Sequence, residues 1–430
     1  MWREGDTVPK LNHRLLVLLA AALLAGALAA ACGGGEEETT EETPGATPEA
    51  TTPAAAEVPG VTDTEIVLGT HFPLSQHLAA AYAPIATAGM KGYFDYINDQ
   101  GGINGRKIRF IICDSQYSPP VAAECARKLV EQDKVFAIVG GLGTPAHSAV
   151  WKYLEENGVP DMFILTGATK WTEPVVKSRF GGNPDYFTEG KILGLYIAKT
   201  YPDAKLGMIL QNDDFGFDGE KGLKAGIEGS NVEVVARETY ESVESDMTAQ
   251  VQRAKNAGAD VLVVYALPPQ GANAVKVARE VVSWDAPIIV TGVVAGDIFI
   301  ALAGAQNAEG VVSVVFGHQI YETADPGVAK HIEIATKYGG GAPPSNFTIT
   351  GQGIAEMMVE VLKRAGKDLT RESFLDAAES LRAWKCSFCL VPISLSPTDH
   401  RSFEIEVYAK VEGGKWVTFG EPIDFESTKE

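Results

Sequence analysis

Two short loops place glycines and hydroxyl residues directly after apolar runs of the chain. Gly140-Gly141-Leu142-Gly143-Thr144 follows the run Phe136–Val139, and Pro145 then favours the first turn of a helix. Thr166-Gly167-Ala168-Thr169 follows the next apolar run, Met162–Leu165. If these runs are parallel strands, the loops lie where open α/β sheets bind ligands, and the free N–H groups of a helix start suit an anionic group. The alternative is that Thr144 and Thr169 only cap helices.

Enzymatic chemistry would need a nucleophile with its base, paired carboxylates or a cluster of metal ligands. The seven histidines are scattered, and no two of them are four residues apart as a helical zinc site would require. No G-x-S-x-G elbow and no Walker loop occurs in the sequence. We therefore expect a binding protein with no catalytic residues, no cofactor and no metal.

The N-terminus has the features of an export signal. Basic residues precede the uncharged stretch Leu15–Ala31, which is rich in Leu and Ala and ends at Cys32. Leu28-Ala29-Ala30-Ala31-Cys32 resembles a lipobox, so residues 1–32 are expected to be a signal and lipoprotein segment with Cys32 as the lipid anchor. The alternatives are cleavage by the ordinary peptidase and an uncleaved anchor helix near the length that spans a bilayer. Each of these places the folded part outside the cytoplasm.

Residues 33–60 are expected to be a disordered acidic tether. Gly33–Glu57 holds seven Glu, no Lys or Arg, and repeated Thr, Pro, Ala and Gly, so it cannot bury enough apolar surface to fold. The whole chain carries a net charge of −20 and has no basic stripe. This balance argues against nucleic acid as a partner, and it leaves the lipid anchor as the only expected contact with the membrane.

The remaining residues, 61–430, exceed what one hydrophobic core usually serves, so two lobes are expected. Apolar runs alternate with longer helical patterns, which is typical of parallel sheets covered by helices on both faces. The expected strands are Ile66–Gly69, Ile108–Ile112, Phe136–Val139, Met162–Leu165, Leu206–Leu210, Val232–Ala236, Val261–Tyr265, Pro287–Val290 and Val311–Phe316. Two helical patterns and a β-rich end follow, so the chain is expected to cross between the lobes more than once.

Four further cysteines are expected to form disulfides, because the protein is exported and their number is even. Cys113 ends an apolar run and Cys125 falls in the next helical segment, so a bridge between them would close a short strand–turn–helix loop. Cys386 and Cys389 form a C-x-x-C that no second C-x-x-C or histidine pair completes as a metal site. We interpret this motif as structural, and the connectivity stays open at this stage.

Three segments resemble the leucine and branched-chain amino acid-binding family of ABC-importer receptors. Asn98–Ile108, which reads NDQGGINGRKI, is similar to the family's N…GGINGR turn. Ala126–Val130 with Val135–Gly141 resembles its next helix and strand, and Ala305–Gly310 resembles its A..AEGV element. The resemblance runs from about Val61 to the C-terminus.

This resemblance implies an α/β fold of the type I periplasmic-binding kind. Two Rossmann-like lobes with parallel sheets would be joined by a three-crossover hinge, with the ligand in the cleft between them. The implied first lobe is 61–182 plus about 318–385, and the implied second lobe is 183–317 plus about 386–430.

The resemblance also implies which residues hold the ligand. In the family, the two loops described above bind a ligand carboxylate through hydroxyl and backbone N–H groups. Thr144 and Thr169 take the hydroxyl positions, and Gly143 and Ala168 supply backbone groups, with Leu142 and Gly167 beside them. Tyr82 corresponds to a wall aromatic, and Phe215 to a second-lobe aromatic that covers the ligand.

Two positions depart from the amino acid-binding members. Those members pair the ligand ammonium with an acidic residue and a neighbouring tyrosine, and this chain has Val293 and Leu267 at these positions. A buried ammonium without a partner costs several kcal/mol, so an amino acid is disfavoured unless Asp297 or Glu173 reaches the cleft.

We therefore expect an extracytoplasmic receptor of an ABC importer of the branched-chain amino acid type. It would close over a small carboxylate-bearing solute, with an organic or aromatic acid favoured, and deliver it to permease subunits. The alternatives are a true amino acid or amide binder, and a binding component that feeds a separate sensor.

Overall fold

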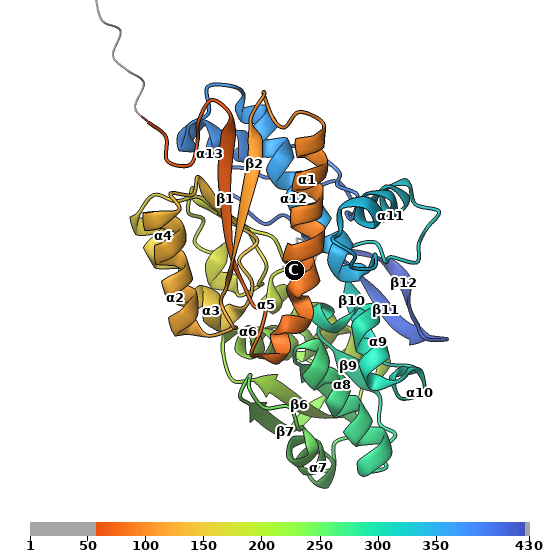
Figure 1. Ribbon diagram of the computed structural model, residues 1–430. Helices are drawn as coiled ribbons and strands as arrows, with labels where there is room; N and C mark the ends of the chain where they lie inside the picture. Colours follow the sequence, from red (N-terminus) through yellow and green to blue (C-terminus); the bar gives the residue numbers. More distant parts are fainter. Residues whose placement is uncertain (1–56, 426–430) are drawn as a thin grey trace, which may run out of the picture. The chain divides into compact units, whose positions relative to one another are not determined.

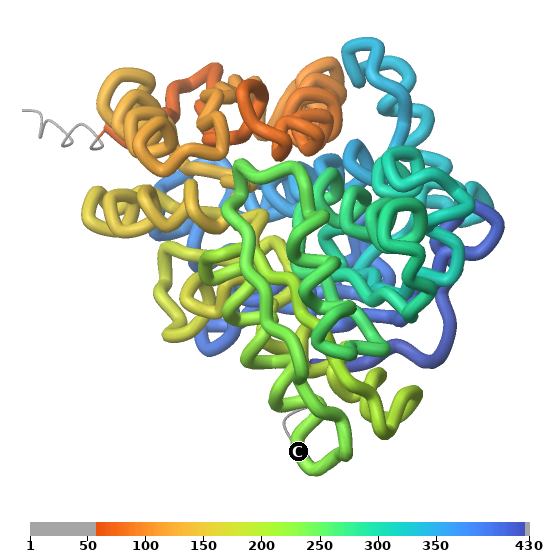
Figure 2. The backbone as a smooth tube through the Cα atoms, turned by 90° about the horizontal axis from the view of Figure 1, so that it is seen from below, coloured from red at the N-terminus to blue at the C-terminus, as the bar shows by residue number. Residues whose placement is uncertain are grey.

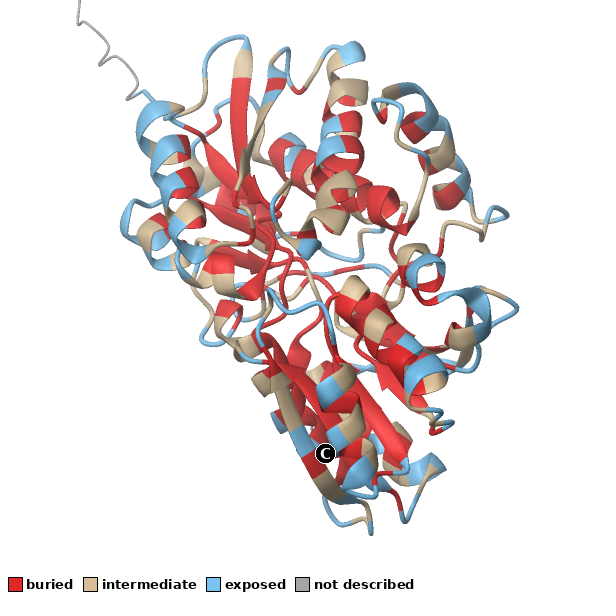
Figure 3. Ribbon diagram, turned by 60° about the horizontal axis from the view of Figure 1, so that its bottom comes forward, coloured by how far each residue is buried: buried red, intermediate tan, exposed pale blue. Residues whose placement is uncertain are grey.

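The computed structural model describes residues 57–425, so the signal segment, Cys32 and most of the expected tether lie outside the described residues. Ala56–Glu430 forms one compact unit. The strands of this unit are largely buried, whereas the outer faces of its helices are exposed (Figure 3). Within residues 57–425, no helix is both long and apolar enough to cross a bilayer.

A five-stranded parallel sheet forms the centre of the first lobe (Figure 1). Its order is β2-β1-β3-β4-β5, and each neighbouring pair is parallel. The strands are β1 (Glu65–Phe72), β2 (Lys107–Asp114), β3 (Ala137–Val139), β4 (Asp161–Ile164) and β5 (Arg179–Gly181). Every residue of β1 after Glu65 is buried, as the continuous apolar run of a strand covered on both faces requires.

Helices pack on both sides of this sheet and belong to two separate parts of the chain. The earlier part contains η1 (Leu78–Tyr82), η2 (Ile85–Met90), α1 (Lys91–Asp99), α2 (Pro119–Arg127), η3 (Lys128–Gln132), α3 (Thr144–Ser148), α4 (Trp151–Glu156) and η4 (Thr169–Trp171). The later part contains α11 (Pro326–Tyr338), α12 (Asn346–Ala365) and α13 (Arg371–Glu379). Figure 1 shows α12 and α13 beside β1, β2 and α1.

The return of α12 to the first lobe depends on a close approach of two helices. A Cβ atom on Gly351 would stand 2.0 Å from the carbonyl oxygen of Ile85, so only glycine lets α12 pass η2 at this distance. Ile354 and Met358 of α12 are buried in the same core cluster as Leu68 of β1. Burial of this apolar face, rather than any local signal, places the helix here.

A seven-stranded sheet forms the centre of the second lobe, in the order β12-β11-β10-β9-β8-β6-β7. Its parallel strands are β6 (Lys205–Gln211), β7 (Glu233–Tyr240), β8 (Val261–Tyr265), β9 (Ile288–Val290) and β10 (Val312–Val315). β11 (Ile405–Glu412) and β12 (Lys415–Asp424) extend it as an antiparallel hairpin. Its helices are α5 (Tyr186–Thr200), α6 (Asp214–Ile227), α7 (Thr248–Asn256), α8 (Pro268–Lys276), η5 (Val277–Val281), η6 (Gly292–Val294), α9 (Asp297–Ala303) and α10 (Ala305–Ala308).

The chain crosses between the two sheets three times. It leaves β5 for α5 through 182–185, leaves β10 for α11 through 316–325, and leaves α13 for β11 through 380–404. The course of the backbone can be followed by colour in Figure 2. The predicted two-lobed α/β architecture with three crossovers is confirmed.

Residues 386–403 differ from the expected lobe assignment, which gave residues from about 386 to the second lobe. Cys386, Phe388 and Phe403 are buried in the core cluster of the first lobe. The backbone N–H and the hydroxyl of Ser387 donate to the Glu356 carboxylate of α12 at 2.6 and 2.5 Å, which holds the segment on that helix. The chain joins the second sheet only at β11.

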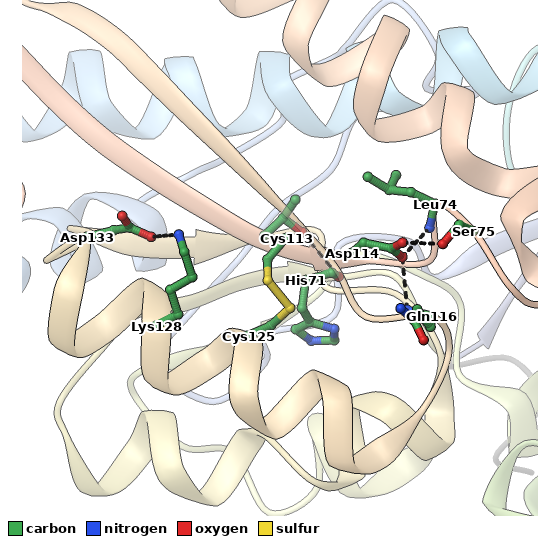
Figure 4. The surroundings of a disulfide bond; sticks show 10 residues. His71, Leu74, Ser75, Cys113, Asp114, Gln116, Cys125, Lys128 and Asp133 are labelled. Carbon is green, nitrogen blue, oxygen red and sulfur yellow. Dashed lines mark hydrogen bonds and ion pairs between the residues drawn. A yellow bond between two sulfur atoms is a disulfide. The ribbon is translucent and has the colours of Figure 1, made fainter.

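Both disulfides of the described chain are local bridges. Cys113 at the end of β2 is bonded to Cys125 on α2, and the ring of His71 lies beside this bridge (Figure 4). Cys386 is bonded to Cys389. The four cysteines therefore form disulfides, as predicted, and the structure gives the connectivity that the sequence had left open.

Candidate functional site

A cleft of about 840 Å³, counting the part that is open to solvent, lies between the two lobes. Its walls are formed mainly by residues at or after the carboxyl ends of β1 to β6 and β8 to β10, together with the first turns of α12. Loop side chains and free N–H groups converge at this edge of parallel sheets, which is where such folds bind ligands.

Leu142, Gly143 and Thr144 form part of the first-lobe wall, where the sequence predicted an anion site. The Thr144 side chain is buried, and its hydroxyl lies 2.5 Å from the hydroxyl of Thr166. Gly143 has a φ of +101°, which is a backbone conformation that favours glycine. A Cβ atom there would also stand 2.4 Å from the Tyr117 ring, so the lack of space requires glycine as well. The helix that follows, α3, has only five residues, so the hydroxyls rather than a helix dipole are the groups that the wall offers to a ligand.

A buried row of three polar side chains, His71, His147 and Asp161, lies behind this loop. Nε2 of His71 lies 2.9 Å from Nδ1 of His147, and Nε2 of His147 lies 2.9 Å from the Asp161 carboxylate. Burial, and then the neighbouring His147, hold the pKa of His71 well below its ordinary value. A neutral His71 can therefore stay packed against Gly141 at the base of the loop.

The second predicted carboxylate loop, Gly167-Ala168-Thr169, is not part of the cleft lining. Its contacts run to two second-lobe helices, α5 and α6, instead. The backbone N–H of Thr169 donates to the Asp218 carboxylate at 3.2 Å, and the carbonyl of Gly167 accepts from the N–H of Tyr186 at 2.8 Å. The structure thus brings Thr166, rather than Thr169, next to Thr144.

Tyr82 and Val293 meet across the cleft. The Tyr82 hydroxyl, from the first lobe, donates to the Val293 carbonyl of the second lobe at 3.1 Å. The Tyr82 ring also packs against Phe347 of α12, with ring centroids 5.0 Å apart. Leu267 lines the cleft at the start of α8.

Phe215 lines the cleft beside tyrosines that sequence reasoning missed. Its ring centroid lies 4.7 Å from that of Tyr186. The Tyr117 hydroxyl accepts from Nε2 of Gln211 at 3.4 Å, which is a further contact between the lobes. Burial raises the pKa of Tyr117 and of Tyr186, so both phenols stay neutral and can donate hydrogen bonds to a ligand.

A further part of the cleft lining comes from crossing segments that the sequence analysis did not single out as site residues. Phe316, Gly317, His318 and Gln319 follow β10, and Phe388 lies in the disulfide-bridged turn. Phe316 and Phe388 pack with ring centroids 5.2 Å apart. The position of 316–319 directly after an apolar strand was the signal that could have found them.

The cleft lining lacks the acidic side chain that a site for a ligand ammonium group would need. Among residues 57–425, those that line the cleft include no Asp, Glu, Lys or Arg. Asp297 follows a lining residue but is not itself in the lining; it lies near Tyr321, whose pKa is raised by burial and then by Glu322 and Asp297. Glu173 is exposed and does not line the cleft either.

Two α/β lobes, crossed three times by the chain and separated by a loop-lined cleft, define the type I periplasmic-binding fold. The chain belongs to the family described as periplasmic binding protein, whose pattern matches residues 65–410. Its members are extracytoplasmic solute-binding proteins and not enzymes, and this chain is such a binding protein.

A sequence relative agrees with this assignment, and two solved structures share the fold. An amino acid binding protein of Pseudomonas aeruginosa is 27% identical over 276 residues, which are 63% of this chain and 71% of that protein. A branched-chain amino acid ABC transporter protein from Thermus thermophilus with bound valine superposes with a TM-score of 0.76 at 21% identity, covering 85% of this chain and 98% of that one. A fatty acid ABC transporter substrate-binding protein from Thermomonospora curvata gives a TM-score of 0.76 at 24% identity, covering 87% and 96%.

Proposed function

We propose that the chain is the substrate-binding component of an ABC importer and captures a small carboxylate-bearing solute with an apolar body. The observation that carries this proposal is the charge of the lining. Hydroxyls of Thr144, Tyr117 and Tyr186 can donate to a carboxylate, whereas no lining side chain in the described chain is an acid that could pair an ammonium. An organic or aromatic acid therefore fits better than an amino acid, because a buried ammonium needs a partner.

The relatives support the transporter part of the proposal. The similar proteins from Thermus thermophilus and Thermomonospora curvata are named as ABC transporter components, one with valine bound and one for fatty acids. Proteins of this fold thus include one named with a bound amino acid and one named for fatty acids. The permease subunits of such an importer are the partners that we propose for this chain.

Hinge closure is the mechanism that we propose for capture. The contacts that join the lobes around the cleft include Tyr82 to Val293, Gln211 to Tyr117, and Lys170 to Asp214 at 2.5 Å. The ligand would dock on the first lobe at Thr144, and the second lobe would then cover it with Phe215 and complete these contacts. Closure would bury the ligand and create the surface that a permease recognises.

A matched pair of ligands tests the ligand class. Isocaproate has the carbon skeleton of leucine without its amino group, so the two differ only in the ammonium. We expect isocaproate to raise the melting temperature of the protein and leucine to have little effect, since a ligand that binds only the folded state stabilises it. Tighter binding of leucine would overturn the acid proposal, because some acidic group would then have to reach the cleft.

Thr144 provides the matched variant. Hydrogen bonds to charged groups are worth about 1.5–3 kcal/mol, so Thr144→Val should weaken binding of a stabilising acid by roughly 10-fold to 100-fold. Thr144→Ser keeps the hydroxyl and should bind almost normally. Thr87→Val, at an exposed position of the same lobe, is the control. Unchanged affinity in Thr144→Val would remove this loop from the site.

Membrane attachment through Cys32 is a separate part of the proposal. The lipobox-like sequence before Cys32 supports lipidation of this residue. Expression of the full chain should yield membrane-bound protein with a diacylglyceryl group on Cys32, detected by mass spectrometry. Cys32→Ala should release the protein, whereas an unmodified N-terminus at Cys32 would indicate the ordinary peptidase.

A further inference from the structure

The buried row of His71, His147 and Asp161 joins three elements of the first lobe behind the loop 140–144. His71 lies near the end of β1, His147 on α3, and Asp161 at the start of β4. All three side chains are buried, and the two imidazole rings are stacked with centroids 5.2 Å apart. Burying polar groups is costly, so a row of them in the core of the lobe needs a specific explanation.

The two histidines contact the loop at three successive residues. A Cβ atom on Gly141 would stand 2.6 Å from Nε2 of His71 and 3.1 Å from Nδ1 of His147, so the two rings fill the space directly behind Gly141. The backbone N–H of Leu142 donates to the His71 carbonyl at 3.4 Å, and the N–H of His147 donates to the Gly143 carbonyl at 2.8 Å. Leu142 and Gly143 line the cleft, so a shift of either histidine would move part of the cleft wall.

The protons of the row can be placed from its contacts. The Asp161 carboxylate lies 2.9 Å from Nε2 of His147, which favours a proton on that nitrogen and leaves Nδ1 of His147 as an acceptor. Nε2 of His71 then carries the proton that it donates to His147 at 2.9 Å. Nδ1 of His71 is left without a proton, and it is buried without a hydrogen-bond partner. Burial, and then His147, hold the pKa of His71 well below its ordinary value, in agreement with a neutral ring.

This order of protons favours one orientation of the His71 ring. A flipped ring would set its unprotonated Nδ1 against the unprotonated Nδ1 of His147 and lose the hydrogen bond. The His147 ring is held further by Trp171, which packs edge-on against it with centroids 4.7 Å apart. His71 lies beside the disulfide between Cys113 and Cys125 (Figure 4). The loop therefore packs against rings whose positions are fixed from several sides.

We propose that His71, His147 and Asp161 are positioning residues that hold the loop 140–144 in the geometry that a carboxylate requires. They would give the site its preference for an acid over a neutral group of the same shape, an inference that rests on the proposed function and deepens it. None of the three lines the cleft, so each acts through the loop. Hydrogen bonds to a carboxylate are stronger and more specific in geometry than those to an amide, so a displaced loop loses affinity for the acid first.

Isocaproate and isocaproamide test this inference by calorimetry, because they share a carbon skeleton and differ in carboxylate against amide. The wild type should bind the acid about tenfold more tightly, since a charged acceptor makes the stronger hydrogen bonds. In His71→Phe, which removes the donor to His147, this preference should fall to about twofold or less. His71→Gln should keep most of the preference, because the glutamine amide can donate to Nδ1 of His147 from a similar place.

His400→Phe separates this role from a loss of stability. His400 is also fully buried in the first lobe, with Nδ1 2.8 Å from the Arg179 carbonyl and Nε2 3.2 Å from the Glu379 carboxylate. Neither partner lines the cleft. Both His71→Phe and His400→Phe should lower the melting temperature, whereas only His71→Phe should lose the preference for the acid. Loss of the preference in both variants would overturn the inference.

If His71→Phe does not fold, nitrogen-15 NMR of the wild type decides. We expect protons on Nε2 of both histidines and none on Nδ1 of His71, and the N–H signals should shift more with isocaproate than with isocaproamide. A different proton pattern or unchanged signals would overturn the positioning role.

The failures of the two proposals differ. A preference for the acid that survives in His71→Phe, or is lost equally in His71→Gln, would overturn the positioning role and leave the proposed function intact. Failure of isocaproate to bind the wild type, or binding no tighter than that of isocaproamide, would overturn the proposed function and this inference with it.

Discussion

Replacing Glu189 by glutamine is expected to stabilise the protein at alkaline pH and to change little at acidic pH. Glu189 lies on α5 and is almost fully buried, and its carboxylate accepts from the Thr291 hydroxyl at 2.5 Å. Glu406 of β11 is also fully buried, and neither of its carboxylate oxygens has a hydrogen-bond partner. Burial raises the pKa of Glu189 to about 7, and burial together with Glu189 raises the pKa of Glu406 well above its ordinary value.

The sign of the effect follows from proton linkage. The ordinary pKa of a glutamate is 4.5, so between this value and about 7 the folded chain keeps a proton on Glu189 that the unfolded chain releases. The stabilisation from this proton is fully present below the unfolded pKa and is lost as the pH rises through the folded one. At about 1.4 kcal/mol for each pKa unit, ionised Glu189 lowers the free energy of unfolding by roughly 3 kcal/mol above pH 7.

Urea unfolding at about pH 5 and about pH 8 measures this difference. Glu189→Gln removes the charge but keeps an oxygen that can accept from Thr291. We expect it to be more stable than the wild type at the higher pH by up to roughly 3 kcal/mol, and similar at the lower pH. Glu233→Gln, at an exposed position of the same lobe, should show no such difference. Equal loss of stability at both pH values in Glu189→Gln would refute the reasoning, since the ionised carboxylate would then be the form that the fold needs.

Three further changes have defined outcomes. Lys170→Met removes an ion pair between the lobes that is partly exposed, so ligand affinity measured by calorimetry should fall by less than about fivefold. Joint replacement of Cys113 and Cys125 by serine opens a short loop and should lower the free energy of unfolding in urea by roughly 3 kcal/mol. Gly143→Ala forces a Cβ atom against the Tyr117 ring at a positive φ, so it should lower the melting temperature and weaken acid binding together. A normal melting temperature in Gly143→Ala would show that the loop can move.

Much of the architecture could be predicted because its signals are local. The runs Ile108–Ile112 and Val261–Tyr265 are strands in the structure, since a strand buried on both faces must be continuously apolar. The loop Leu142–Thr144 could be marked in advance because the end of a parallel strand is a fixed place in such folds. The three-residue strand β5 was missed, because its pairing with β4 rather than its composition defines it.

The cleft itself depended on contacts between distant segments. From the sequence alone, the chain length predicted two lobes and the alternation of apolar and helical runs predicted parallel α/β sheets. The loops after the apolar runs indicated where one wall would lie. Only the tertiary structure decided that Thr166 rather than Thr169 meets Thr144, and that His318 and Phe388 line the same cleft. The physical reason is that apolar periodicity is a property of a single segment and can be read from its sequence. The approach of α12 to η2 depends on packing, and the contact of Ser387 with Glu356 depends on hydrogen bonds, between segments far apart in the chain.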